Sequence, residues 1–250
     1  MGVYLVTGAA SGIGLATTKM LAADGHQVFA LDRDGGRLAT AFDGFEGPRP
    51  NGLIADVADP ASVAAALAEV AEGTTVLDGL VNAAGVVSVV PFEELTADDW
   101  ETTFRINVVG TFLVLQAALP LLRAADAPSV VNLASMAGKI ATMYTAAYNA
   151  SKAAVISLTR SAALTFAPGI RVNAVCPGVV ATPMYEEIDR RMVAVGAPEM
   201  LRFKQRAAQA PMGRAATADE VASVIVFLLG SGAAFMTGED VNITGGLVMH

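Results

Sequence analysis

The 250-residue chain has few of the side chains that metal or disulfide chemistry needs. It contains one cysteine, Cys176, and two histidines, His26 and His250. A lone cysteine forms no internal disulfide, which fits a reducing compartment, and the three side chains together make a poor set of zinc ligands. With so few imidazoles to act as a base, we expect Cys176 to be a buried, inert thiol. His26 is expected in a surface loop, and we expect no catalytic role for His250.

Charge is also scarce, and positive charge in particular. Charged residues make up 16% of the chain, against roughly 25% in a typical soluble domain. The net charge of −8 argues against nucleic acid and anionic membranes as partners, because both attract basic surfaces. Hydrophobic residues reach 54%, and so few charges cover the surface of a monomer poorly. We therefore expect sizeable contacts between subunits.

The apolar runs do not resemble export signals or membrane spans. Met1–Thr18 lacks a basic start and contains four glycines. Val108–Leu122 is fifteen residues long and is interrupted by Gln116 and Pro120. Val221–Gly238 is split by a Gly-Ser-Gly triplet. All three are interpreted as the core of a soluble, cytoplasmic protein that does not contact a membrane.

Short apolar runs alternate with longer helical patterns along the chain, and the runs lack polar alternation, as in a parallel sheet covered on both faces. Seven strands are expected, at Val3–Thr7, Gln27–Leu31, Gly52–Ala55, Gly79–Asn82, Ser129–Ala134, Ile170–Val175 and Asp240–Ile243. Helices are expected at Gly14–Asp24, Pro60–Glu72, Ala97–Ala124, Ala146–Phe166 and Ala218–Leu229. This order predicts a single α/β domain over residues 1–250, a Rossmann-like doubly wound parallel sheet with helices on both faces.

Residues 182–213 break this pattern. The segment has no predicted strand, contains four methionines and is dense in charge. An insertion of this size near a strand end is usually a lid or substrate loop.

A glycine-rich turn joins the first predicted strand to the first helix. Gly8, Gly12 and Gly14 fit the pattern G-x-x-x-G-x-G. Glycine lets the backbone turn sharply and approach a pyrophosphate, and the helix N-terminus supplies N–H groups and a positive dipole end. Such turns also occur for packing alone. Asp32 lies at the end of the second predicted strand, where a carboxylate accepts hydrogen bonds from an adenosine ribose, although a solvated loop aspartate is the alternative.

The stretch "YNASK" places Tyr148 and Lys152 four residues apart. This spacing puts both side chains on one face of a helix, which would also suit an ordinary helical turn. It equally suits a phenol held beside an ammonium for proton transfer. A free phenol has a pKa of about 10, and a close positive charge lowers it by about 1–3 units.

With "TGAASGIG", "NAAG", "SM…YNASK" and "PG" in this order, the chain resembles the short-chain dehydrogenase/reductase family from Val3 to about Gly246. The resemblance implies the sheet order 3-2-1-4-5-6-7, a nicotinamide cofactor and no metal. It implies that Tyr148 is the acid/base and Lys152 its charged neighbour. Ser135 would hydrogen-bond the substrate oxygen, and the backbone carbonyl of Asn107 would hold a water beside the lysine.

The resemblance also implies a set of cofactor-binding residues. They are Gly8, Ser11, Gly12, Ile13 and Gly14 in the turn, Asp32 and Arg33 at the ribose, Asp56 and Val57 at the adenine, Asn82, Ala83 and Gly85 after the fourth strand, Tyr148 and Lys152, and Pro177, Gly178, Val180 and Thr182 near the nicotinamide.

Two of these positions bear on the choice of cofactor. NADP-preferring relatives usually carry a basic residue where this chain has Ser11. Arg33 is the complication, because some relatives bind the phosphate with a basic residue there. The carboxylate of Asp32 should repel a 2′-phosphate, and we therefore predict NAD.

The predicted activity is interconversion of a secondary alcohol and a ketone. Segments that line the family's pocket carry apolar residues here, which favours a hydrophobic or alicyclic substrate: Val87, Val90, Phe92, Met143, Val179 and Met184. Tyr144 is placed on the pocket wall beside Met143, without a catalytic role. The insertion also carries cations that would suit a negatively charged substrate instead. The alternative is that they are ordinary exposed charges on a helix. They are Arg190, Arg191, Arg202, Lys204 and Arg206.

Two alternatives remain on the same fold. One is an NADPH-dependent reductase of 3-oxoacyl thioesters, and the other is a non-catalytic dinucleotide sensor. The resemblance implies a homotetramer in which Ala97–Ala124 and Ala146–Phe166 pair across a two-fold axis and the last helix and strand form another interface.

Overall fold

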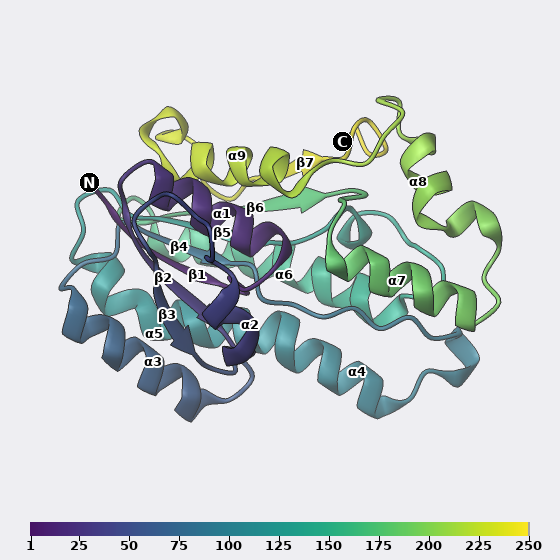
Figure 1. The fold of residues 1–250 in the computed structure, drawn as a ribbon, viewed down its shortest axis with the longest axis horizontal. Helices are drawn as coiled ribbons and strands as arrows, with labels where there is room; N and C mark the ends of the chain where they lie inside the picture. Colours follow the sequence, from purple (N-terminus) through teal and green to yellow (C-terminus); the bar gives the residue numbers. More distant parts are fainter. Residues whose placement is uncertain (250) are drawn as a thin grey trace.

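The computed structural model describes residues 1–249, and His250 lies outside the described residues. Seven parallel strands form one sheet in the order β3-β2-β1-β4-β5-β6-β7, which confirms the predicted topology (Figure 1). The predicted strands were correct to within about two residues at either end. The strands are β1 Val3–Thr7, β2 Gln27–Asp32, β3 Asn51–Ile54, β4 Gly79–Asn82, β5 Ser129–Leu133, β6 Arg171–Pro177 and β7 Asp240–Ile243.

Helices cover both faces of the sheet (Figure 1). α1 (Gly12–Ala23) and α9 (Ala218–Leu229) pack together on one face. α3 (Pro60–Gly73), α5 (Gly110–Arg123) and α6 (Ala146–Phe166) contribute to the apolar cluster on the other face. Asp59 caps α3 by accepting a hydrogen bond from the N–H of Ala61 at 3.0 Å, and Pro60 occupies the first turn.

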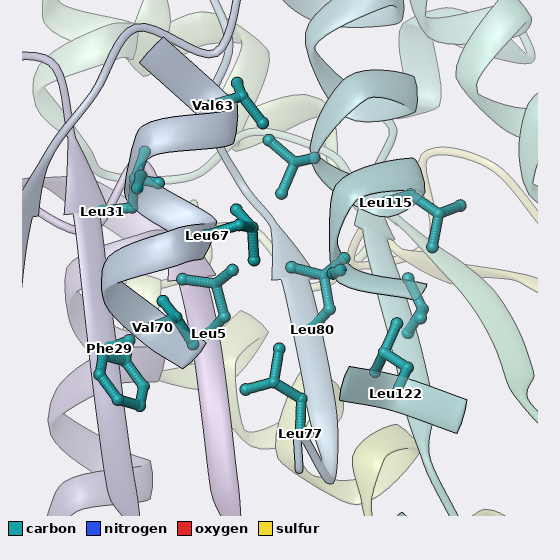
Figure 2. Packing of buried hydrophobic residues seen from close by; sticks show 14 of the residues in the cluster. Leu5, Phe29, Leu31, Val63, Leu67, Val70, Leu77, Leu80, Leu115 and Leu122 are labelled. Carbon is teal, nitrogen blue, oxygen red and sulfur yellow. The ribbon is translucent and has the colours of Figure 1, made fainter. Parts of the chain in front are cut away.

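The larger apolar cluster lies between the sheet and the α3–α5 layer. Leu5 of β1 and Leu80 of β4 are completely buried there, and Leu67 of α3 and Leu122 of α5 pack against them (Figure 2). Each such side chain stabilises the fold by about 1.5–3 kcal/mol. This packing fixes the strand ends on which the cofactor turn and the polar side chains sit.

The helix predicted at Ala97–Ala124 is not a regular α-helix. It consists of α4 (Ala97–Phe104), a π-helical turn at Arg105–Val109 and α5. In the π-helical turn the N–H of Gly110 bonds to the carbonyl of Arg105, five residues back. The stretch is long enough to span a membrane, and an 18-residue window within it, 39% of which is buried in the protein, has a mean hydropathy of 1.6. One side of α5 packs into the core, including Val114 and Leu122.

The insertion, residues 182–213, folds into helices at one end of the molecule (Figure 1). It contains α7 (Pro183–Ala194), a short helix at Glu199–Leu201 and α8 (Phe203–Gln209). Another short helix, α2 (Gly35–Thr40), was not predicted; Asp34 caps it through the N–H of Arg37 at 2.9 Å.

Candidate active site

The glycine turn between β1 and α1 depends on the absence of side chains. Gly8 and Gly12 have φ angles of +66° and +53°, a region that favours glycine. A Cβ on Gly8 would lie 2.8 Å from the backbone nitrogen of Ala84, and a Cβ on Gly14 would lie 2.2 Å from the carbonyl oxygen of Gly8. Ser11 caps α1 in an extended conformation without a side-chain hydrogen bond. The first N–H groups of α1 therefore remain available to an anion.

A cavity of about 290 Å³ opens beside this turn and extends along the ends of β1, β2 and β4. The Asp32 carboxylate lies on its wall and accepts hydrogen bonds from the N–H groups of Ala10 and Asp34, both at 3.0 Å. These two bonds hold the carboxylate against the glycine turn and leave acceptor capacity on both oxygens. A glycine cradle, an open helix N-terminus and a fixed carboxylate together fit a dinucleotide.

A second cavity of about 250 Å³ continues from the first. The two cavities share wall residues, which makes them one cleft: Ile13, Ala83, Gly85, Leu133, Thr182 and Met184. Of the predicted cofactor residues, all but Asn82 line one cavity or the other. Asn82 is 3% exposed and donates a hydrogen bond to the Asn132 side chain at 2.9 Å. It lies in the interior of the sheet.

Ser135, Tyr148 and Lys152 all line the second cavity. Ser135 follows β5, and its hydroxyl accepts a hydrogen bond from the N–H of Ala137 at 3.1 Å. A Cβ on Gly138 would lie 2.7 Å from the backbone carbonyl carbon of Lys152, so glycine allows the turn after β5 to pack directly on α6. This close packing brings the serine from the sheet to the tyrosine and lysine of the helix.

Lys152 is 4% exposed, and its ammonium donates a hydrogen bond to the Leu133 carbonyl at 2.6 Å. The same nitrogen lies 5.7 Å from the centre of the Tyr148 ring. Burial lowers the pKa of Lys152 to about 8, because a charged ammonium is poorly solvated there. The group is therefore mostly charged at neutral pH.

Burial raises the pKa of the Tyr148 phenol above its ordinary value, and a hydrogen bond with the Ser135 side chain opposes this shift. Nearby Tyr185 and Cys176 raise the pKa of the phenol further. Desolvation is the largest of these effects, and the predicted lowering of this pKa by Lys152 together with a positively charged nicotinamide stays a prediction. With its pKa raised, the phenol keeps its proton at neutral pH.

Asn107 lies in the π-helical turn and is 1% exposed. Its amide nitrogen donates to the Val86 carbonyl and to the Ser151 hydroxyl, both at 2.9 Å, and its side-chain oxygen accepts from the N–H of Val86 at 2.8 Å. Its backbone carbonyl accepts the Thr111 hydroxyl at 2.8 Å. A carbonyl oxygen has two lone pairs, so the water-holding role implied by the resemblance stays a prediction.

Sequence reasoning placed some pocket residues correctly and missed others. Val87, Met143 and Met184 line the second cavity, whereas Val90, Phe92, Val179 and Tyr144 do not. Phe92 is 78% exposed, and Tyr144 adopts φ of +65° while its carbonyl bonds to the N–H of Val90 at 2.8 Å. The insertion contributes Arg206, one of the five cations that the sequence analysis had named, and residues that it had not named: Tyr185, Ile188, Met192 and Leu201.

The remaining candidates for metal or thiol chemistry lie outside the cleft. Cys176 is completely buried, and burial raises the pKa of its thiol to about 11. His26 accepts a hydrogen bond from the N–H of Gly2 at 2.9 Å and contacts the Tyr4 ring. Among residues 1–249, no cluster of His, Cys, Asp or Glu has the arrangement of a metal site.

Comparison with known proteins gives consistent matches over nearly the whole chain. A family model described as enoyl-(acyl carrier protein) reductase matches residues 8–248. The chain is 38% identical to a D-threitol dehydrogenase from Mycolicibacterium smegmatis over 98% of its length and 92% of that protein. It is 35% identical to a cyclopentanol dehydrogenase from Comamonas testosteroni over 98% of its length and 96% of that protein. The structure is also similar to that of an actinorhodin polyketide ketoreductase variant with NADPH, with a TM-score of 0.92 and 34% identity. The match covers 98% of this chain and 97% of that chain.

Proposed function

The chain belongs to the short-chain dehydrogenase/reductase family and is an oxidoreductase of the CH–OH group; on this basis, we propose that it interconverts a secondary alcohol and a ketone with NAD(H), with Tyr148 as the acid/base. The observation that supports this most directly is the convergence of Ser135, Tyr148 and Lys152 on a cavity continuous with the glycine turn.

The cofactor supplies hydride transfer at its nicotinamide ring. The protein's own groups handle the proton and the geometry. The Tyr148 hydroxyl donates a proton to the ketone oxygen and becomes a phenolate, and in the reverse direction the phenolate accepts the proton of the alcohol. Ser135 holds the same oxygen by a hydrogen bond. The Lys152 ammonium, fixed by the Leu133 carbonyl, supplies the positive charge that stabilises the phenolate left after proton donation.

The test is Tyr148→Phe, which removes only the hydroxyl. We expect kcat to fall by at least about a hundredfold, the scale of acid–base assistance, while folding and NADH binding stay nearly unchanged. Tyr144→Phe is the matched control and should be far milder, because Tyr144 does not line the cavity. Substantial turnover by Tyr148→Phe would contradict the assignment of Tyr148 as the acid/base.

Our proposal of NAD over NADP depends on Asp32. Its carboxylate is fixed at the ribose end of the first cavity, and Ser11 is neutral where a basic residue would favour NADP. We expect kcat/KM to favour NAD by at least about tenfold, a gap of about 1.4 kcal/mol. Asp32→Ala should reduce this preference. Steady-state kinetics with both cofactors, in both proteins, is the measurement.

The close alternative is an NADPH-dependent reductase of 3-oxoacyl thioesters. Two observations favour it: Arg33 and Arg37 line the cofactor cavity, and one similar structure is a polyketide ketoreductase with NADPH. Against it, Arg37 lies 3.6 Å from the Asp34 carboxylate, which offsets its charge. Preference of the wild-type enzyme for NADP, together with turnover of an acetoacetyl thioester, would select this alternative. A non-catalytic sensor is disfavoured because the predicted serine, tyrosine and lysine are all in place.

For the substrate we propose a hydrophobic or alicyclic alcohol or ketone. The walls of the second cavity are mostly apolar, with Val87, Ile140, Met143, Ile188 and Met192 among them. One relative is named for cyclopentanol and another for the polyol threitol, so a panel of both classes is the relevant comparison. A marked preference for polyols would reverse this proposal.

We also propose a cytoplasmic homotetramer. Large apolar side chains are exposed on the helices predicted to pair and on the C-terminal part of the chain: Val109, Phe112, Leu164, Phe227 and Phe235. Association would bury these side chains. A stable monomer at micromolar concentration in sedimentation would contradict the assembly.

A further inference from the structure

The cations of the insertion differ in what balances them. Arg190 and Arg191 both pair with the Glu187 carboxylate. Arg202 pairs with Asp189 at 2.9 Å. Each of these three guanidinium groups therefore has a carboxylate partner within the insertion.

Arg206 is balanced differently. It is partly buried, lines the second cavity, and hydrogen-bonds the side chain of Tyr185, a neutral phenol. Lys204, on the same short helix, is exposed and does not line the cavity. A phenol satisfies one donor of a guanidinium but does not neutralise its charge, and Arg has five N–H donors.

The charge of the whole cavity is consistent with an anion. Within residues 1–249, the charged residues that line it are Lys152 and Arg206, and no Asp or Glu does so. The chain as a whole carries a net charge of −8, so this is a local concentration of positive charge on an acidic protein. In a largely apolar cavity such charges attract a negative group more strongly than they would on the surface.

Arg206 is held in place by the packing of α8 on α7. The Asp189 carboxylate accepts a hydrogen bond from Arg202 and another from the N–H of Phe203, both at 2.9 Å. The rings of Tyr185 and Phe203 pack edge to face with centres 5.1 Å apart. These contacts join the two helices directly above the cavity wall, so the guanidinium is preorganised.

Tyr185 connects this cation to the predicted catalytic centre. It lines the same cavity as Tyr148 and interacts with Arg206. The guanidinium and the phenol that would transfer the proton therefore face one cavity.

We propose that Arg206, with Tyr185, forms an anion subsite, and that the substrate is an oxo or hydroxy acid: a compound with a ketone or secondary alcohol, an apolar body and a terminal carboxylate, sulfonate or phosphate. This inference depends on the proposed function for the reacting end of the molecule. The apolar walls accept the body of the substrate, and the guanidinium binds its acidic group through paired N–H donors.

The test compares acids with neutral analogues of the same shape. Acetoacetate and levulinate are assayed as ketone substrates beside their methyl esters, and acetonyl sulfonate and acetonyl phosphate identify the type of anion. We expect wild type to favour at least one anion over the ester by about tenfold or more in kcat/KM. Arg206→Met should lower kcat/KM for that anion by about a hundredfold and change the ester by less than about threefold.

Lys204→Met is the matched control, since it removes a cation from the same helix outside the cavity, and it should change neither substrate by more than about twofold. Arg206→Lys keeps the charge but not the paired donors, and should recover part of the loss. Thermal unfolding of each variant shows whether the fold is retained.

Binding is measured separately from turnover by calorimetric titration of levulinate and acetonyl phosphate into wild type and Arg206→Met. Binding that needs Arg206, without reduction of any ketone, would keep the subsite and overturn the proposed function. Turnover of neutral ketones with no advantage for any anion, in wild type and variant alike, would overturn the subsite and leave the proposed function in place.

Discussion

The two halves of the cleft are built in different ways. The cofactor half is made mainly of backbone: the close approaches at Gly8 and Gly14 and the uncapped N-terminus of α1. The substrate half is made of side chains, several of which come from the insertion. The charges differ too. Asp32, Asp34 and Asp56 line the first half beside two arginines, whereas the second half has only cations among the described residues.

This difference shows where specificity is located. A backbone cradle recognises what all dinucleotides share, and it requires glycine at fixed positions, which leaves a motif in the sequence. A pocket of side chains can change its ligand through one substitution and leaves no motif. The same molecule is therefore easy to assign to a family and hard to assign to a substrate.

The largest effect should come from filling the backbone cradle. In Gly14→Ala the new Cβ would lie 2.2 Å from the Gly8 carbonyl oxygen and 3.1 Å from that of Thr7, so the turn must move. We expect cofactor affinity to fall by at least about a hundredfold and stability by about 1–3 kcal/mol. Gly36→Ala, with a nearest contact of 3.5 Å, is the control. Fluorescence titration with NADH measures the cofactor affinity of the two variants. Wild-type affinity in Gly14→Ala would refute a cradle made by the backbone.

A second test addresses Lys152, where the two halves meet. Its pKa of about 8 in the folded protein lies below the ordinary value of about 10.4. Below pH 8 both states carry the proton, and the fold bears the full cost of the buried charge. Above pH 8 the folded state releases the proton first, so this cost declines until the unfolded chain also titrates.

Wild type should therefore gain about 1.6 kcal/mol of unfolding free energy relative to Lys152→Met between pH 8 and pH 9.5. Chemical denaturation at several pH values measures the difference. Lys204→Met, which removes an exposed cation, is the control and should show no such trend relative to wild type. If the difference in unfolding free energy between wild type and Lys152→Met does not change with pH, the ammonium is well solvated.

The smallest effect concerns the substrate wall. Ile188 of α7, which the sequence analysis did not name, lines the cavity, whereas Phe92, an apolar residue predicted to line it, lies outside and is 78% exposed. Ile188→Ala should raise KM for a preferred ketone by about fivefold, since it removes apolar contact worth about 1 kcal/mol. Phe92→Ala should change KM by less than about twofold. The reverse ranking would mean that the loop before α4, and not the insertion, forms the wall.

The sequence predicted the sheet order, the glycine turn and the convergence of Ser135, Tyr148 and Lys152, because each follows from local pattern or from a fixed motif. It did not predict Tyr185 in the cavity, and it named Arg206 only as one of five cations in the insertion, since which of these side chains reach the cavity depends on how α8 docks on α7. The displacement of Phe92 and Tyr144 from the pocket likewise follows from loop conformation. The raised pKa of Tyr148 required the extent of burial, which spacing alone does not reveal.

The π-helical turn at Arg105–Val109 sets the rotational phase between the two halves of a long helix. An α-helix advances by about 100° per residue, and the wider turn absorbs one extra residue. Asn107 can thus face Ser151 and Val86 while α5 keeps its apolar side against the core. Removing one residue from this turn would rotate α4 against α5 by about 100°. Among related chains, this stretch should keep its length and the asparagine at position 107.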